Sequence, residues 1–513
     1  MKTQAHNILL VLLALMLYAH AGGQPDFYLK AGKPVDFDPE TASNLYAADS
    51  SHCYLLRLSN KGCIEFNTGN DAFIEAFDKG LNPDNSIRLT LNSPKKYRRL
   101  QPIVFHKTND GYLILCKFYT SANKIMKAFL IRADDTGHVN NELKVVAKIE
   151  NVEPSLKDFH FFDLKKIFEG EEARYVLSIS TPAELLIPER INFLIFDEQL
   201  NLIGERLIDF PDDVLDYEFS EILSGIGGPV FFRIEVTNPY FPEKTVHQLI
   251  VYDVFKDRHQ SFEFEFEQGK IAKAGLFKLE ENKIGLTGYY TKDDKSDEPA
   301  GVFYYVFDPY GGSLLRQKIF NLTEDGLNRI GPGNLESKSG HEHLCPKSIH
   351  LSTNNNIVLA FEYNWKDMML IRDQEGKLYP KQVFKANEII IFNFSPTDAF
   401  INMGIIPKQQ LLNSRQGYLG FFSFLIGQEL MLIYNDHPKN LKEYQGNKLK
   451  TMKTRFGPVI VNYNINKSTY LKKPLEFGKS PCICKPHDVI KLSENSMLFL
   501  NKGTKSRLIK IGF

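Results

Sequence analysis

One pattern recurs along the chain: two alternating strands joined by a tight turn. Apolar and polar residues alternate on both sides of a short Asn, Asp, Gly or Ser turn, which is typical of a β-hairpin. Clear copies occupy residues 104–119, 275–290, 348–363 and 488–500, and looser copies begin near residues 161, 217 and 420. A third apolar strand follows every copy, and a fourth follows all except the last. A chain of such units must bury them against one another, so the repeat constrains the fold more than any other feature.

Seven four-stranded units without convincing helices predict a β-propeller. The last copy ends at the chain terminus with room for three strands only, and a ring must close. We therefore predict an all-β protein with a single propeller of seven four-stranded blades closed by an N-terminal strand. Residues 86–92 are the candidate for pairing with residues 507–511, and residues 53–66 are the alternative. Six or eight blades, a large sandwich or two β domains stay open.

The repeat shape resembles that of secreted β-propeller proteins, including uncharacterised ones exported by bacteria. The resemblance covers about residues 86–513 and rests on the strand pattern. The chain shows no Trp-Asp tails, no Gly-Gly kelch pairs and no Asp-boxes at regular intervals. The resemblance therefore implies a fold and carries over no catalytic residue. It divides the chain into a propeller, residues 86–513, and an N-terminal extension with a β-hairpin, residues 22–85.

The N-terminus has the form of a secretory signal peptide. Lys2 opens a short polar segment, residues 8–18 are an uninterrupted apolar run, and Ala19 and Ala21 are small. Residues 1–21 are the predicted signal peptide, and the mature protein is predicted to be a monomer in the periplasm or outside the cell. We expect no transmembrane segment, because no later stretch approaches about 20 apolar residues. The formal net charge is +0, which gives no reason to expect nucleic acid as a partner.

Long connections should gather on one face of the predicted disc, because alternate connections within a blade lie on the same side. We call this the long-loop face. Long loops cost conformational entropy and are usually retained for binding. The function predicted is therefore binding of a ligand through this face. The connections concerned are residues 237–247, 291–300, 364–387 and 435–455, with inter-blade segments 321–346 and 472–487.

Aromatic residues are the first candidate binding group on the long-loop face. A flat exposed ring can stack on a sugar or clamp a peptide at low entropic cost. The partner predicted is a glycan, a peptide or a protein; the alternative is that these rings only hold long loops against the disc. The residues are Trp365, Tyr363, Tyr240, Tyr379 and Tyr444.

Histidine and cysteine form a second group, and lysine a third. The segment from His341 to His350 includes His343 and Cys345, while Cys482, Cys484 and His487 lie two predicted blades later. A disulfide from Cys345 to Cys482 or Cys484 is preferred over a zinc site, because the spacing matches no standard finger. We predict no metal and no cofactor. The lysine-rich loop 439–455 could hold an anionic ligand or could simply be a solvated loop.

Catalytic signatures are scarce. No nucleophile elbow, phosphate-binding glycine loop or His-Glu-x-x-His motif occurs. We therefore predict no catalytic residue. The alternative is a carbohydrate hydrolase or lyase that uses loop carboxylates, such as Asp293 and Glu298, near the central channel.

Overall fold

The computed structural model describes the following residues of the chain: 28–33, 42–48, 51–58, 63–64, 72–91, 100–139, 143–152, 162–169, 172–181, 190–209, 216–224, 229–238, 241–264, 269–292, 299–322, 343–372, 377–412, 418–441, 449–452, 457–475, 484–486, 489–493, 496–501 and 507–512. The signal peptide prediction lies outside these residues. No helix in this part of the chain is long and apolar enough to cross a membrane.

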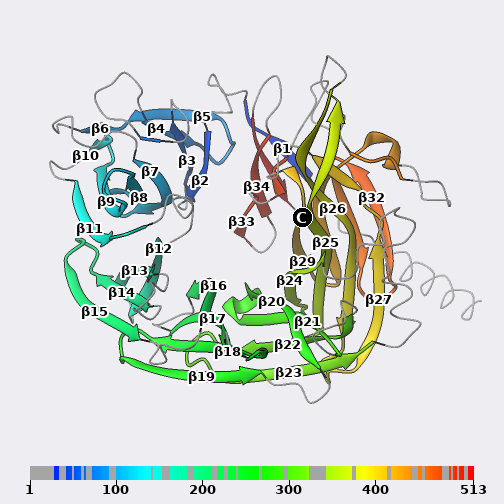
Figure 1. The fold of residues 1–513 in the computed structure, drawn as a ribbon. Coiled ribbons are helices and arrows are strands. Elements are labelled where there is room, and N and C mark those ends of the chain that lie inside the picture. The colour runs from blue at the N-terminus through cyan, green and yellow to red at the C-terminus, as the bar shows by residue number, and fades with distance from the viewer. Residues whose placement is uncertain are drawn as a thin grey trace, which may run out of the picture.

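The described strands form eight sheets, which follow one another in chain order around a common centre (Figure 1). The first sheet contains β2 (Ala42–Ala48), β3 (Cys53–Leu58), β4 (Ala72–Phe77) and β5 (Pro83–Arg88). The second contains β6 (Thr90–Leu91), β10 (His138–Val139), β9 (Ile125–Asp134), β8 (Gly111–Thr120) and β7 (Gln101–Thr108), with β11 (Lys144–Ile149) paired to β9. The third contains β12 (Phe162–Glu169), β13 (Glu172–Thr181), β14 (Arg190–Phe196) and β15 (Leu202–Asp209).

The fourth to eighth sheets continue the series. The fourth contains β16 (Asp216–Ser224), β17 (Pro229–Asn238), β18 (Phe241–Asp253) and β19 (Arg258–Phe264); the fifth contains β20 (Lys270–Lys278), β21 (Ile284–Thr291), β22 (Pro299–Phe307) and β23 (Leu314–Asn321), with the 3-10 turn η3 (Glu280–Asn282). The sixth contains β24 (Leu344–Leu351), β25 (Ile357–Arg372), β26 (Leu378–Phe394) and β27 (Phe400–Ile406), with β28 (Gln410–Leu412) paired to β26. The seventh contains β29 (Phe422–Ile426), β30 (Glu429–Asp436), β31 (Gly457–Asn464) and β32 (Thr469–Pro474), with the 3-10 turn η6 (Pro438–Leu441). The eighth contains β33 (Ile490–Ser493), β34 (Ser496–Asn501), β35 (Arg507–Gly512) and β1 (Tyr28–Ala31).

The core lies between neighbouring sheets. Side chains alternate across a strand, so each middle strand serves two interfaces. On β25, Leu359 and Phe361 pack with Tyr304 of the fifth sheet. The intervening residues Val358 and Ala360 pack on the opposite side, in the cluster shared with the seventh sheet. The second and third strands are therefore nearly continuous apolar runs. In the outer strand β23, by contrast, half-buried side chains alternate with exposed ones.

The last sheet joins the two ends of the chain. β1 pairs antiparallel with β35, and the backbone N–H of Gly32 donates to the carbonyl of Leu508 at 3.0 Å. The prediction that an N-terminal strand completes this sheet is confirmed, but the strand predicted was wrong. Within residues 86–92, β5 pairs with β4 and β6 pairs with β10. The alternative, residues 53–66, is also wrong, because β3 pairs with β2 and β4.

The preferred count of seven blades is also corrected, since the part of the chain that the structure describes forms eight sheets. The additional one is β2–β5, within the residues assigned to an N-terminal extension. Within this sheet β3 pairs with β2 and β4, and Ile64 makes an isolated bridge with Leu100. Each sheet packs on the next, from the first to the eighth, through a cluster of buried side chains, which is the arrangement of a propeller.

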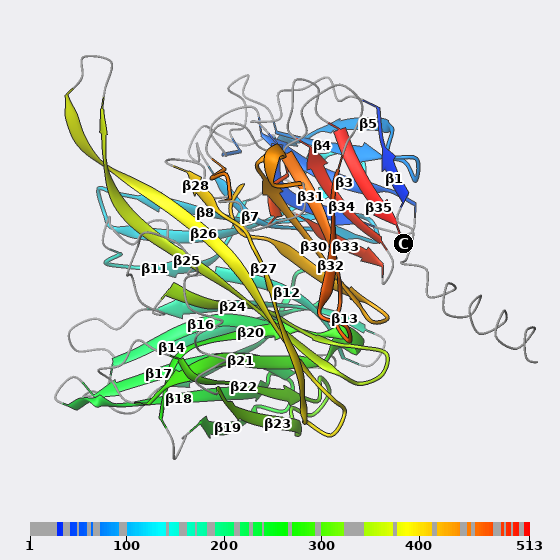
Figure 2. The same ribbon diagram turned by 90° about the vertical axis from the view of Figure 1, so that its right-hand side faces the viewer.

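Two of the predicted long loops are instead strands. β25 and β26 pair from Ile357 with Phe394 out to Arg372 with Leu378. We call the outer part of this pair, from Asn364 opposite Ala386 to Arg372 opposite Leu378, the arm. Figure 2 shows the arm projecting far beyond the other strands of its sheet. Residues 237–247 likewise belong mostly to β17 and β18. Strand pairing satisfies the backbone groups of the described residues in both segments.

Candidate functional site

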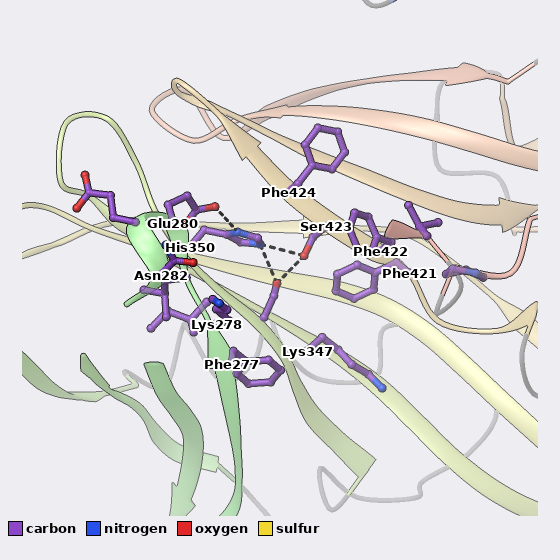
Figure 3. A pocket seen from close by; sticks show the side chains of 16 residues that line it. Phe277, Lys278, Glu280, Asn282, Lys347, His350, Phe421, Phe422, Ser423 and Phe424 are labelled. Atoms are coloured by element: carbon purple, nitrogen blue, oxygen red, sulfur yellow. Dashed lines mark hydrogen bonds and ion pairs between the residues drawn. The ribbon is translucent and has the colours of Figure 1, made fainter. Parts of the chain in front are cut away.

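A cavity of about 790 Å³ lies among the first strands of the fifth, sixth and seventh sheets, β20, β24 and β29 (Figure 3). Each of these strands is the inner edge strand of its sheet, and the three sheets are consecutive, so the cavity faces the centre of the ring. Its wall is largely apolar, as is usual for a small-molecule site. The apolar residues that line it are Phe277, Leu279, Ile349, Phe421, Phe422, Phe424, Pro486 and Val489.

A chain of hydrogen bonds crosses this wall from Glu280 to Ser423. His350 Nδ1 lies 3.2 Å from Glu280 Oε1, and a carboxylate only accepts, so Nδ1 carries the proton. His350 Nε2 lies 3.0 Å from Ser423 Oγ and 3.1 Å from Ser348 Oγ. The Ser423 hydroxyl donates to Ser348 Oγ at 2.7 Å. Figure 3 shows His350 between Glu280 and the two hydroxyl groups. The arrangement is an acid, an imidazole and a hydroxyl in sequence.

Local structure places each member of this chain. Ser348 and His350 are two residues apart on β24 and therefore share one face. A β-bulge precedes them, because Pro346 and Ser348 face consecutive residues of β25 and Lys347 is the extra residue. Ser423 occupies the first strand of the next sheet, beside this face. Three sheets thus contribute to one hydrogen-bonded group.

Glu280 is presented by the tight turn between β20 and β21. Glu281 and Asn282 both have positive φ, 57° and 58°, and the N–H of Lys283 donates to the carbonyl of Glu280 at 3.3 Å. Two consecutive left-handed residues are the mark of a type I′ hairpin turn. Glu280 is the first residue of this turn, so its side chain can reach β24, where the N–H of Leu351 donates to Oε2 at 2.7 Å.

Glu280 is an anion at this site. Burial alone would raise the pKa of its carboxyl, but the neighbouring His350 and the Leu351 N–H lower it, and the result lies below the ordinary value of 4.5. The carboxylate therefore stays ionised near neutral pH. It can hold His350 in one tautomer and offset a positive charge on the ring.

Charge within the cavity is almost balanced, with one exception. Glu281 pairs with Lys283 at 2.6 Å, and Lys347 Nζ lies 3.5 Å from Glu362 Oε2. Lys278 is the one cation of the described lining that has no ion-pair partner. Partial burial lowers the pKa of its ammonium group, and the charge of Lys165 on β12 lowers it further. An anionic ligand would relieve this repulsion.

The aromatic residues predicted from sequence are dispersed. Tyr363 is only 3% exposed and belongs to the core between the fifth and sixth sheets, so the prediction of an exposed ring there was wrong. Trp365 and Tyr379 both lie on the arm. The Trp365 ring is partly buried and stacks on His343, with centroids 5.1 Å apart and planes at 6°. Tyr240 and Tyr444 lie outside the described residues.

The predicted disulfide does not form at Cys345, which is a free thiol that accepts a hydrogen bond from Lys273 Nζ at 3.6 Å. Cys484 is buried, and its backbone N–H donates to Asn435 Oδ1 at 3.1 Å, while Cys482 lies outside the described residues. Two of the predicted histidines have other contacts, because His343 stacks on Trp365 and His350 enters the cavity. Within the described ranges, no cluster of three or more His, Cys, Asp or Glu residues could hold a metal ion.

Glu388 on β26 provides a test of the buried environment around Tyr363. Burial raises the pKa of Glu388 to about 7, although its own backbone N–H and the charge of Lys408 oppose the change. Its folded pKa exceeds the ordinary 4.5, so the folded state holds more protons than the unfolded state between these values. The contribution of Glu388 to the free energy of unfolding should thus be fully present below pH 4.5. It should fall by roughly 3 kcal/mol as the pH rises to 7.

The variant Glu388→Gln should remove this dependence. We expect it to raise the melting temperature at pH 8 and to leave it unchanged at pH 4.5, as measured by calorimetry. Glu263→Gln on the outer strand β19 is the matched control and should have no effect at either pH. An equal gain from Glu388→Gln at both pH values would contradict the assignment.

Sequence reasoning missed Glu280, Ser348, Ser423 and Lys278. The spacing of Ser348 and His350 on one strand face was an available signal, because two polar residues on an inner strand need a polar neighbour. No signal in the sequence links them to Ser423, which lies on a different sheet. The contact arises only from the curvature of the ring.

The fold is a β-propeller. No protein-family model and no curated protein matches the sequence. Among solved structures, the chain is similar to the WD40 domain of SCAP from fission yeast, at 8% identity over 95% of this chain and 98% of that one, with a TM-score of 0.42. It is also similar to the β-propeller domain of the Trilobed protease from Pyrococcus furiosus, at 12% identity over 66% and 78%, with a TM-score of 0.30. An endo-arabinanase from Bacillus licheniformis gives 9% identity over 56% and 97%, with a TM-score of 0.25. Likeness at this level carries no argument about function.

Proposed function

We propose that this chain is an exported β-propeller that binds a small organic carboxylate in the cavity between β20, β24 and β29. The observation that carries this proposal is the Lys278 ammonium group, which has no ion-pair partner among the described residues of a largely apolar wall. A cation without an ion-pair partner favours an anion, and phenylalanine rings favour an apolar body. Export rests on the N-terminal sequence alone.

The hydroxyl groups of Ser423 and Ser348 and the ring of His350 complete the recognition chemistry. They offer directional hydrogen bonds beside the apolar surface, which is how small-ligand sites fix orientation. Glu280 is already engaged by His350 and by the Leu351 N–H, so it does not repel a second anion as an isolated carboxylate would. A carboxylate with an aromatic or branched apolar group fits both parts of the wall.

Calorimetric titration with phenylacetate and 3-phenylpropionate, each compared with its neutral amide, tests the proposal. We expect the acids to bind and the amides to bind at least about tenfold more weakly, which corresponds to about 1.4 kcal/mol. Lys278→Gln should remove the difference and Lys278→Arg should keep it. Lys283→Gln is the matched control, because Lys283 lies in the same turn but pairs with Glu281. Equal binding of acids and amides to the unaltered protein would contradict the proposal.

The long-loop face stays a second candidate, for a peptide or protein partner. The observation that favours it is the arm, where Met368 is 60% and Leu370 is 67% exposed. Such apolar side chains on a projecting hairpin suit a protein contact. Cross-linking from a photoreactive residue at position 370 tests this surface separately from the cavity.

Carbohydrate cleavage, the alternative from the sequence, receives no support from the cavity. A glycosidase needs two carboxyl groups facing the same bond. The acidic residues of the described lining are Glu280 and Glu281, and each is engaged, by His350 and by Lys283 respectively.

A further inference from the structure

We propose that the cavity also hydrolyses carboxylic esters, with Ser423 as the nucleophile, His350 as the general base and Glu280 as the residue that positions His350. This rests on the proposed function, because the acid released would be the carboxylate that the cavity binds. The spacing supports it: 3.0 Å from Ser423 Oγ to His350 Nε2 and 3.2 Å from Nδ1 to Glu280 Oε1 lie within reach for nucleophile, base and orienting group.

Ser423 rather than Ser348 is assigned as the nucleophile. Ser348 is 9% exposed, whereas Ser423 is only partly buried and presents more of its surface to a ligand. The Ser423 proton can pass to Nε2 directly, or through Ser348, which accepts it at 2.7 Å and lies 3.1 Å from Nε2. Ser348 therefore supports the proton transfer, in addition to its place in the cavity lining.

The step balances with water as the only co-reactant. Ser423 Oγ attacks the ester carbonyl carbon while its proton moves to His350 Nε2. The bond from carbon to the alkoxy oxygen then breaks, the alkoxy oxygen takes the proton from Nε2, and an alcohol leaves an acyl-Ser423. Water attacks the acyl carbon and gives a proton to Nε2, the Oγ–carbon bond breaks, and Ser423 recovers its proton as the acid leaves.

The oxyanion formed in each half has two sources of stabilisation. β29 is the terminal strand of its sheet, so alternate N–H groups along its outer edge are not used in the ladder beside Ser423. The Lys278 ammonium group adds positive potential on the same wall (Figure 3). Donors of this kind, placed in an apolar pocket, are commonly the largest contribution to acyl transfer.

Covalent labelling tests the assignment. A fluorophosphonate probe, which phosphonylates an activated serine and releases fluoride, should add one adduct per chain, on the peptide that contains Ser423. Ser423→Ala should abolish the adduct, and His350→Gln should slow labelling at least about 100-fold. Ser348→Ala should keep the adduct on Ser423. Ser395→Ala, on an exposed turn between β26 and β27, is the matched control and should label like the unaltered protein.

Hydrolysis of p-nitrophenyl phenylacetate provides the second readout. We expect turnover in the unaltered protein and loss of at least about 100-fold in Ser423→Ala, while an unchanged melting temperature and circular dichroism spectrum show that this variant folds. A protein that binds phenylacetate but takes no probe at Ser423 would overturn the ester hydrolysis and leave the proposed function intact. Labelling at Ser423 that is unaffected by His350→Gln would also overturn it. Labelling and turnover without selective carboxylate binding would instead remove the proposed function and retain the hydrolysis.

Discussion

A chain that starts at residue 34 should melt at least about 5 °C below a chain that starts at residue 22. The shorter chain lacks β1, which supplies the fourth strand of the sheet that holds both ends of the polypeptide. Without β1, backbone groups of β35 lose their hydrogen-bond partners. Each hydrogen bond lost should lower the free energy of unfolding by about 1 kcal/mol. Scanning calorimetry measures the change, and the new strand edge should also increase aggregation.

A point substitution separates this effect from simple truncation. Gly32 follows β1, and a Cβ atom added there would lie 1.8 Å from the carbonyl oxygen of Leu81. Gly32→Ala should therefore displace the end of β1 and reproduce much of the loss. Gly311→Ala is the control, because the atom closest to its added carbon would be Asp308 Oδ2 at 3.3 Å. A truncated protein that melts at the original temperature would show that β1 contributes nothing to the ring.

Lys408→Met should lower the free energy of unfolding by about 3–5 kcal/mol, which is the usual cost of removing one member of a buried ion pair and leaving the other without its partner. Lys408 and Glu362 are both 0% exposed and are in direct contact. Burial alone would raise the pKa of Glu362, but the charges of Lys408 and Lys347 bring it below its ordinary value. The substitution would leave this carboxylate with the more distant Lys347.

The double variant Lys408→Met with Glu362→Met should recover most of the loss, because neither position then carries a fully buried unpaired charge and the new side chain packs near the ring of Phe421. Urea unfolding monitored by fluorescence measures both variants. Lys148→Met is the surface control, since Lys148 pairs with Glu150 where both are exposed, and should change stability by less than about 1 kcal/mol. Additive losses in the double variant would contradict the account.

The sequence predicted the strands well because local alternation and turn residues determine them. Residues 275–290 form the end of β20, a tight turn that includes Glu280–Asn282, and most of β21, as expected, with Leu276 opposite Leu286. The first sheet, β2–β5, was missed because residues 42–88 do not repeat the strand–turn–strand pattern. The closing strand was misplaced because β1 is only four residues long and shows little alternation. Pairing of β1 is decided by the position of β35, which no local pattern encodes.

The candidate site was less predictable than the fold. His350 was singled out, but as part of a metal or cysteine cluster, because its neighbours in sequence are His343 and Cys345. Its contacts in space are Glu280, in the preceding sheet, and Ser423, in the following one. Such contacts depend on how consecutive sheets turn around the centre. The arm shows the same limit, because length and polarity suggested a loop where cross-strand pairing produced strands.

The position of β1 also has a consequence for how the protein is made. The first described strand to leave the ribosome is paired with the last, so it must wait for nearly the whole chain. At roughly 5–20 residues per second, this delay is about 25 to 100 s. During that time the first seven sheets can form in order, while the eighth has neither its inner strands nor its partner. A cell that produces this protein must keep β1 from pairing elsewhere until β35 has been synthesised.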